Sequence, residues 1–322
     1  MLRAFPDSSL RSARSQSRQQ FHQQLRRPRR VLPRTFAAAG LSLLAAAAAA
    51  CGDAATAPRS APWLGEIAPT QPAHPAAWTG ERVLRVGSTT IQARIDRRTG
   101  VRKGPTVVLL SGLDTPLDVW AKVRTGLAGD APVFSYDRGG VDRSGAVTGE
   151  RPSSVVAREL HATLAAAGLR PPYLLVAHSV AGVHARVFAD RYRAEVAGVV
   201  LIDATHEMLL AGMTTEQIAE VAAGLKYEGS KAEVLAQRTS AAEVAASRLP
   251  DVPLAVITSM RPEADEPPGA REFLAALQAE WLQQVTRGEQ VLTPVGHYVM
   301  TEAPETVLAV TRRVLAAARG AQ

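Results

Sequence analysis

From residue 82 onward, short apolar runs alternate with stretches of helical character. Two runs, 82–87 and 89–96, flank a Gly-Ser turn and predict an antiparallel pair of strands. Six further, mostly apolar runs lie at 106–112, 132–137, 173–179, 197–203, 253–259 and 290–296. Helical stretches lie near 152–168, 180–192, 267–287 and 303–319. Because apolar strands that alternate with helices are typical of a sheet buried on both faces, we predict an α/β fold with a mostly parallel, eight-stranded sheet and helices on both faces.

Residues 205–249 interrupt this alternation with a long helix-forming stretch where a short crossover would be enough. In open α/β sheets, ligands bind outside the carboxyl ends of the strands. An insertion that follows a strand at that edge is placed to cover such a site. We therefore predict one domain over 81–320 that carries a small helical lid at about 205–249.

The first 51 residues have the layout of a signal peptide. Arginine-rich polar sequence precedes an apolar stretch at 36–51, which ends in small residues before Cys51. This stretch is shorter than the roughly 20 residues that a membrane-spanning helix needs. Residues 48–51 resemble a bacterial lipoprotein cleavage box, whose cysteine receives a diacylglyceryl group. We predict a signal peptide with a lipobox over 1–51; the alternative is an ordinary secretory signal with an incidental cysteine.

Residues 52–80 are rich in Pro, Ala, Thr and Gly and show no periodicity. This composition is typical of a disordered tether. Together with the leader, it predicts an exported protein of the cell envelope whose partner is the membrane, through a lipid anchor on Cys51. Without lipidation, the prediction is a secreted or periplasmic protein.

Charge is concentrated in the leader. The chain holds 37 basic and 30 acidic residues, but nine of the basic and only one of the acidic residues lie in 1–50. The remainder is close to neutral and has no basic stripe with interleaved aromatic residues, so we exclude nucleic acid as a partner. The sequence has a single cysteine, no H-x-x-x-H pair and no G-x-G-x-x-G motif. We predict neither a metal nor a cofactor.

The sequence LLVAHSVAG at 174–182 marks the candidate reactive centre. A predicted strand ends at Ser179 and a predicted helix begins directly after it, which is the arrangement of a nucleophile elbow. The tight turn projects the serine hydroxyl out of the sheet beside a helix N-terminus, which stabilises negative charge. Ala177 and Ala181 stand where the G-x-S-x-G consensus has glycine. A serine that caps a helix after a core strand is the alternative interpretation.

A serine hydroxyl is a poor nucleophile unless a base accepts its proton and a third group orients that base. His297 follows the last predicted strand and a glycine, and we predict that it is the base. Asp203 ends the strand after the nucleophile helix, so its carboxylate emerges at the same edge of the sheet as the serine. We favour Asp203 as the acid, with Asp265 and then Glu263 as the alternatives.

Two further histidines lie near this centre in the sequence. His178 directly precedes the serine, so we expect its side chain to point away from the serine and into the core. His206 stands at the start of the predicted lid, and we expect it to contact a substrate rather than to accept the proton.

Catalysis at a carbonyl also needs donors for the oxyanion, and backbone N–H groups are suited to this because they are fixed before the reaction starts. Val180 follows the candidate nucleophile directly. Leu113 lies in the loop after the strand 106–112, where a glycine allows a sharp turn. We predict that the N–H groups of these two residues form the oxyanion hole.

These motifs together resemble the α/β-hydrolase superfamily, in its lid-bearing esterase, dehalogenase and epoxide-hydrolase branch, over about 82–318. VVLLSGLDTPLDVW (107–120) is similar to the family's strand, oxyanion loop and tryptophan. SYDRGGVDRS (135–144) is similar to its D-x-R-G-x-G-x-S loop, and VGHYVMTEAPETV (295–307) to its histidine loop. Ser111 replaces the usual histidine of the oxyanion loop, and Asp142 replaces a glycine.

The identity of the nucleophile decides what the resemblance implies. Dehalogenases and epoxide hydrolases of this family attack with aspartate, so Ser179 implies an acyl-enzyme and a small-molecule acyl substrate: an ester, lactone, thioester or amide. A cofactor-free perhydrolase, with peroxide in place of water, is one alternative. A non-catalytic ligand-binding protein on this fold is another. The sequence leaves the substrate and the oligomeric state open.

Overall fold

The computed structural model describes residues 78–100, 104–264 and 266–320. The predicted signal peptide, Cys51 and most of the predicted tether lie outside the described residues. Trp78 is buried, and its indole Nε1 donates a hydrogen bond to the Ala167 carbonyl oxygen at 3.1 Å. The fold therefore includes the last residues of the segment 52–80.

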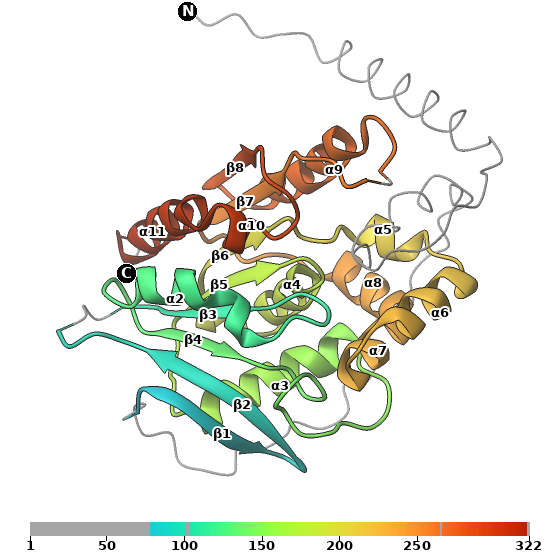
Figure 1. Cartoon of the computed structure of the whole chain (residues 1–322). Coiled ribbons are helices and arrows are strands. Elements are labelled where there is room, and N and C mark those ends of the chain that lie inside the picture. The colour runs from blue at the N-terminus through green and yellow to red at the C-terminus, as the bar shows by residue number, and fades with distance from the viewer. Residues whose placement is uncertain (1–77, 101–103, 265, 321–322) are drawn as a thin grey trace, which may run out of the picture.

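The strands in the described part of the chain form one sheet in the order β1-β2-β4-β3-β5-β6-β7-β8 (Figure 1). β2 is antiparallel to both of its neighbours, and the other adjacent pairs are parallel. The strands are β1 (Gly80–Val86), β2 (Thr89–Asp96), β3 (Thr106–Leu110), β4 (Val133–Tyr136), β5 (Tyr173–His178), β6 (Val196–Ile202), β7 (Leu254–Ser259) and β8 (Gly288–Thr293). The predicted fold class, a mostly parallel eight-stranded α/β sheet, is confirmed, and each strand overlaps a predicted run.

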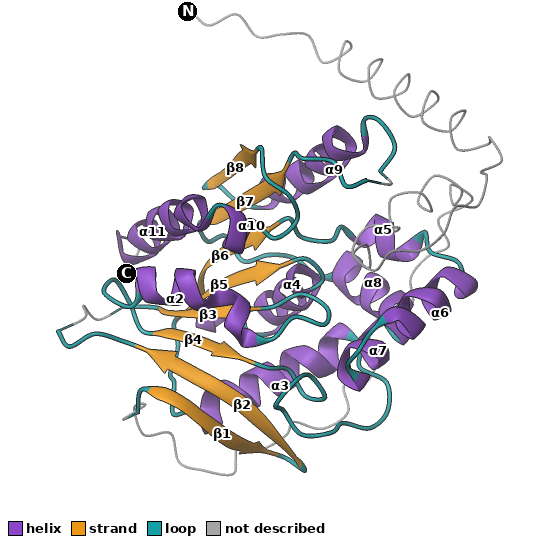
Figure 2. Cartoon of the chain, in the orientation of Figure 1, coloured by secondary structure: helices purple, strands orange, loops and turns teal. Residues whose placement is uncertain are grey.

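Helices cover both faces of the sheet and bury two separate cores (Figure 2). Alternate residues of a strand point to opposite faces. In β3, Val108 and Leu110 therefore join one core, while Val107 and Leu109 join the other. The first core is covered by α3 (Ser153–Ala166) and α4 (Ala181–Arg191), and the second by α2 (Ala121–Leu127), α10 (Val299–Glu302) and α11 (Pro304–Gly320).

The segment 205–249 folds as short helices with an apolar cluster of their own. The helices are α5 (Glu207–Ala211), α6 (Thr215–Gly224), α7 (Glu228–Leu235) and α8 (Gln237–Ala246). A capping box between Thr214 and Gln217 begins α6, because each side chain accepts a hydrogen bond from the other residue's backbone N–H. Leu113, from the loop after β3, packs against a cluster formed by Met213, Ile218, Ala222, Leu225 and Val234.

A buried ion pair ties α7 to the loops after β3 and β4. Arg138 follows β4 and donates to both carboxylate oxygens of Glu233 on α7, from Nε at 2.8 Å and from Nη2 at 3.0 Å. The same guanidinium group donates to the carbonyl oxygens of Ser111 and Gly112. Arg138 therefore holds the loop after β3 and the inserted helix together.

The sequence pattern does not predict every helix. The 3₁₀ turns η2 (Leu117–Trp120) and η3 (Arg193–Glu195) and the helix α2 are short, and short helices carry little periodicity. The predicted helix 267–287 is α9 (Ala270–Ala279), followed by the 3₁₀ turn η4 (Glu280–Gln284). Gly269 has a φ of +82°, so α9 begins only after it. Among the described residues, no helix is both long and apolar enough to cross a membrane.

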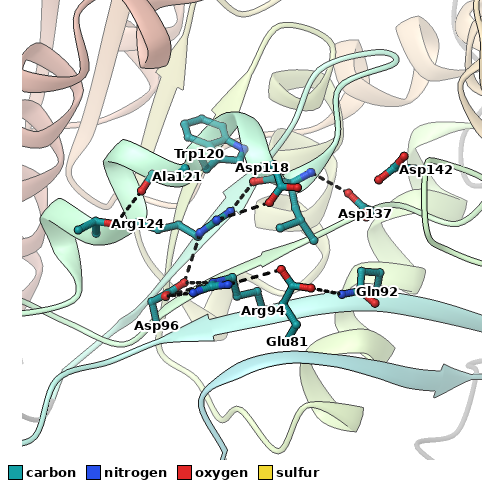
Figure 3. A network of polar contacts seen from close by, with 12 residues as sticks. Glu81, Gln92, Arg94, Asp96, Asp118, Trp120, Ala121, Arg124, Asp137 and Asp142 are labelled. Atoms are coloured by element: carbon teal, nitrogen blue, oxygen red, sulfur yellow. Dashed lines mark hydrogen bonds and ion pairs between the residues drawn. The ribbon is translucent and has the colours of Figure 1, made fainter.

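Charged side chains link the antiparallel edge of the sheet to α2 (Figure 3). On β2, Arg94 Nε donates to Asp96 Oδ2 at 3.0 Å, and the same carboxylate oxygen lies 3.3 Å from Arg124 Nε on α2. Asp137, after β4, accepts the Leu117 N–H at 2.7 Å and so fixes the start of η2. This buried carboxylate holds the chain that leads from β3 into α2.

The burial of Asp137 makes the stability of the protein depend on pH. Burial raises the pKa of Asp137 to about 6, although the hydrogen bond from the Leu117 N–H acts in the opposite direction. Because the folded state then binds this proton more tightly than the unfolded state, Asp137 lowers stability as pH rises from about 4 to about 6. Asp137→Asn keeps an acceptor and cannot ionise. In denaturant titrations, we expect the free energy of unfolding of this variant minus that of wild type to increase as pH rises from about 4 to about 6. A difference that does not change with pH would contradict this expectation.

Candidate active site

Ser179 lies in the turn that joins β5 to α4, at the carboxyl edge of the sheet. Its φ of +57° is in the left-handed region, which is uncommon for residues other than glycine. The Ser179 N–H donates to the Ile202 carbonyl oxygen at 3.1 Å, and the Ser179 carbonyl accepts the N–H groups of Gly182 at 3.0 Å and Thr205 at 3.1 Å. The segment after β6 therefore holds the serine in a conformation that is typical of functional sites.

Close packing behind this turn requires small residues. A Cβ atom at Gly182 would lie 2.5 Å from the Ala204 Cβ, so a larger residue would push the segment after β6 away. Ala177 and Ala181, which stand where the consensus has glycine, are fully buried. In this chain, Gly182 is therefore the position behind the serine turn where the lack of a side chain is needed.

Asp203 and His297 are joined by a short hydrogen bond. Asp203 directly follows β6, His297 lies between β8 and α10, and His297 Nδ1 is 2.6 Å from Asp203 Oδ2. Asp203 has a φ of +41°, and its N–H donates to the Ile257 carbonyl oxygen at 2.7 Å. A carboxylate at Nδ1 makes that nitrogen the donor of the neutral ring and leaves Nε2 as the acceptor. Among the described residues, no hydrogen bond joins the Ser179 hydroxyl to this ring.

The other candidate acids are not seen at His297. The Glu263 N–H donates to the Glu266 carboxylate at 2.9 Å, and no hydrogen bond between Glu263 and His297 is present in the described part of the chain. Asp265 lies outside the described residues. Within residues 78–100, 104–264 and 266–320, no group of three or more His, Cys, Asp or Glu side chains is placed to hold a metal ion.

Several donors converge on the buried carboxylate of Asp203. Ser259 donates its N–H to Oδ1 at 3.1 Å and its hydroxyl to Oδ2 at 3.2 Å, and Arg271 Nη1 reaches both oxygens, at 3.1 and 3.0 Å. Burial by itself raises the pKa of Asp203. The hydrogen bond and charge of His297, followed by the charge of Arg271, outweigh burial, so the pKa lies below its ordinary value. Asp203 is therefore ionised at neutral pH.

His178 is buried, as expected, but its ring lies against the His297 loop. Its Nε2 is 3.0 Å from the His297 carbonyl oxygen, to which it donates, and the two ring centroids are 4.5 Å apart. Burial, followed by the positive charge of His297, lowers the pKa of His178 to about 3. The ring is therefore neutral at neutral pH and holds the His297 backbone in place.

Leu113 and Val180 belong to the two segments that meet at Ser179: the loop after β3 and the serine turn itself. A Cβ atom at Gly112 would lie 3.1 Å from the Ser179 Cβ, so the loop after β3 passes directly against the serine. Neither Leu113 nor Val180 donates its N–H to a backbone acceptor within the described ranges. Two carbonyl oxygens of this loop are held by Arg138, which fixes the position of the Leu113 amide.

Asp114 provides a second link between this loop and α7. Its φ of +49° turns the chain sharply after Leu113. Its carboxylate accepts two backbone N–H groups at the start of α7, and its own N–H donates to a serine hydroxyl on that helix at 3.0 Å. These partners are Lys226, Tyr227 and Ser230.

His206 does not have the expected position of a substrate contact. It is buried, stacks on Trp281 at a centroid distance of 5.3 Å, and accepts the Met208 N–H on Nδ1 at 3.2 Å as the cap of α5. Burial lowers its pKa to about 4, although Glu207 acts in the opposite direction. His206 is therefore a neutral structural residue.

A model of the alpha/beta hydrolase fold matches residues 105–238, which run from β3 through the serine turn to α8. The enol-lactonase from Burkholderia xenovorans LB400 is 18% identical and superposes with a TM-score of 0.54, over 73% of this chain and 100% of that one. A thermophilic esterase from Thermogutta terrifontis is 19% identical, with a TM-score of 0.54, over 74% of this chain and 99% of that one. The match over residues 105–238 and the eight-stranded sheet both indicate the alpha/beta hydrolase fold.

Curated relatives match this chain over part of its length. The uncharacterized protein YqjL of Bacillus subtilis (strain 168) is 32% identical over 100 residues, which are 31% of this chain and 40% of YqjL. The chain spans at most 40% of the length of the curated relatives that it matches. The solved structures are too distant in sequence to indicate more than the fold, so the reaction has to be argued from the site.

Three residues of this site carry no signal in the sequence: Ser259 and Arg271, which contact the Asp203 carboxylate, and Glu266, which contacts Arg271. Arg271 is separated from Asp203 by 68 positions, and Ser259 by 56. A charged residue beside other charged residues at the start of a helix is typical of a solvated surface. Only the packing of α9 on the end of β7 brings Arg271 to the acid, and no local signal indicates it.

Proposed function

We propose that this protein is a serine hydrolase that cleaves a carboxylic ester-type bond, in an ester, lactone, thioester or amide, through an acyl-enzyme. The observation that carries the proposal is the 2.6 Å hydrogen bond between His297 and the buried Asp203, at the sheet edge that also presents Ser179. A carboxylate on one imidazole nitrogen leaves the other nitrogen free to act as a base. The enol-lactonase and the thermophilic esterase share this fold, and a serine nucleophile at this edge of the sheet is what leads us to propose an acyl substrate.

In the proposed reaction, the Ser179 hydroxyl oxygen attacks the acyl carbonyl carbon while His297 Nε2 accepts the hydroxyl proton. Asp203 stabilises the imidazolium that forms, and the Leu113 and Val180 N–H groups donate to the oxyanion. The tetrahedral intermediate collapses as His297 returns the proton to the leaving alcohol, thiol or amine. Water then attacks the acyl-enzyme with His297 as the base, which releases the acid and restores the serine.

The surroundings of the site are part of the proposal. The helices of 205–249 form the lid, and their apolar cluster packs on Leu113 beside the proposed oxyanion hole. Residues 1–51 direct export, and Cys51 carries a lipid that holds the enzyme at the membrane. Metabolic labelling with a radioactive fatty acid, compared between wild type and Cys51→Ser, tests the anchor.

The test of the reaction is a fluorophosphonate probe, which reacts with activated serines. The purified chain is incubated with the probe, and its intact mass is recorded for wild type, Ser179→Ala and His297→Ala. We expect one adduct on wild type and none on either variant, because the first lacks the nucleophile and the second lacks its base. No adduct on a folded wild-type protein would overturn the proposal and favour a ligand-binding role for the fold.

A further inference from the structure

A buried ion pair between Arg271 and Glu266 contacts Asp203 through Arg271. Arg271, on the first turn of α9, is 1% exposed and contacts both Asp203 carboxylate oxygens through Nη1. Its Nε donates to Glu266 Oε2 at 2.8 Å. Arg271 Nη2 and Glu266 Oε1 also lie 2.8 Å apart, out of line for a hydrogen bond. Asp203, Arg271 and Glu266 therefore form a buried row of alternating charge.

Arg271 alone would work against the proposed chemistry. The orienting carboxylate acts by stabilising the imidazolium that forms when the serine loses its proton. An arginine in contact with that carboxylate cancels its negative charge, and charges interact strongly where water is excluded. Glu266 restores the balance, because two carboxylates and one guanidinium leave a net charge of −1 beside His297.

We infer that Arg271 and Glu266 are positioning residues of the proposed hydrolase: Arg271 fixes the Asp203 carboxylate, and Glu266 cancels the charge of Arg271 so that Asp203 still stabilises the His297 imidazolium. The inference rests on the proposed function, since it concerns the base of that reaction. Arg271 also donates to the Ser259 hydroxyl at 2.8 Å, which in turn donates to Asp203. The orientation of the carboxylate is thus held by donors on both β7 and α9.

Other ionisable groups also face His297, and none of them is changed in the variants that are compared below. His178, from the end of β5, lies with its ring tilted against that of His297, at a centroid distance of 4.5 Å, and donates a hydrogen bond to the His297 carbonyl oxygen. Tyr298 lies with its ring centroid 5.5 Å from that of His297. In the same loop, the Gly296 N–H donates to Glu302, which pairs with Arg261 at 2.7 Å. None of these groups contacts Glu266 through a hydrogen bond or ion pair among the described residues.

The test compares the pH profile of kcat/KM for 4-nitrophenyl acetate in wild type, Glu266→Gln and the double variant Glu266→Gln with Arg271→Met. Glutamine still accepts the Arg271 Nε–H but removes one negative charge, so the imidazolium is less stable. We expect the acidic limb to move to lower pH by about half a unit. The double variant returns the net charge to −1, so its acidic limb returns to the wild-type position, with kcat about tenfold lower because Asp203 is less well held.

Glu272→Gln, at an exposed neighbouring position on α9, is the matched control and leaves the acidic limb in place.

A purely structural role for the pair would lower activity equally at all pH values, and an unmoved limb in Glu266→Gln would overturn the inference. Active-site titration with the fluorophosphonate normalises the rates to folded enzyme. NMR titration of the His297 ring, assigned by comparison with His297→Gln, measures the same shift without turnover. A wild-type protein that hydrolyses no ester would therefore contradict the proposed function, while the NMR midpoint of Glu266→Gln would still decide the charge relation.

Discussion

Replacing Asp203 with asparagine is expected to lower kcat by about four orders of magnitude, the size of the effect in the serine protease whose triad acid is changed in the same way. An amide at this position has two orientations. It turns its N–H group toward His297, or it turns its carbonyl oxygen toward His297 and so away from Arg271. In the first case the imidazole takes the tautomer with the proton on Nε2, which cannot accept the Ser179 proton. The measurement is kcat on an activated ester, with enzyme concentration from active-site titration.

The same substitution is expected to destabilise the protein, because the Arg271 guanidinium and the Ser259 hydroxyl lose a charged acceptor in a buried site. The expected loss is about 1–3 kcal/mol in the free energy of unfolding. Ser179→Ala is the contrasting variant: it removes the nucleophile, but no hydrogen bond of the Ser179 hydroxyl is recorded among the described residues, so stability should hardly change. Wild-type turnover in Asp203→Asn would assign the acid elsewhere, with Asp265 and Glu263 as the next candidates.

Replacing Glu233 with glutamine is expected to lower the free energy of unfolding by about 3–5 kcal/mol at neutral pH, because it leaves the buried Arg138 without its charge partner. Both side chains are almost fully buried, and they share two hydrogen bonds. Burial raises the pKa of Glu233, but the charge of Arg138 outweighs it and holds the pKa far below the ordinary value. This contribution is present above pH 4.5 and is lost as pH falls through the depressed pKa of the folded state. Denaturant titration at neutral and acidic pH measures both effects.

Glu228→Gln is the control on the same helix. Glu228 pairs with Lys231 at 2.7 Å, but its side chain is 78% exposed. An exposed pair of this kind contributes about 0.5 kcal/mol or less. If Glu233→Gln destabilised the protein no more than Glu228→Gln does, the pair with Arg138 would not be the link that holds α7 to the sheet.

The central strands could be predicted from the sequence because a strand buried on both faces is mostly apolar. β5 and β7 show this directly: every residue in Tyr173–His178 and Leu254–Ser259 is buried. The end of β5 at His178, with Ser179 in the turn, could be predicted for the same reason. The start of α9 could not be predicted. It is set by the left-handed backbone conformation of Gly269, which leaves no trace in the hydrophobic periodicity.

The partner of His297 could be proposed from chain order and sheet position, but its surroundings could not. Asp203 is the last residue of an apolar run, which places it at the sheet edge whatever the rest of the chain does. Arg271 reaches Asp203 through the packing of α9 on β7, and Glu266, in the loop before α9, contacts Arg271. Neither residue has a feature in the sequence that distinguishes it from a solvated charge. The burial of His206 could not be predicted for a related reason, since its stacking on Trp281 is a tertiary contact.

The links between α7 and the loop after β3 limit how a substrate can enter. Arg138 holds Glu233 and two loop carbonyl oxygens at once, and the Asp114 carboxylate accepts the N–H groups of the two residues directly before α7. A movement of α7 away from the sheet to admit a substrate would therefore displace the Leu113 amide. A lid movement that leaves the proposed oxyanion hole intact therefore has to occur in the other helices of 205–249, while α7 stays fixed to the loop after β3.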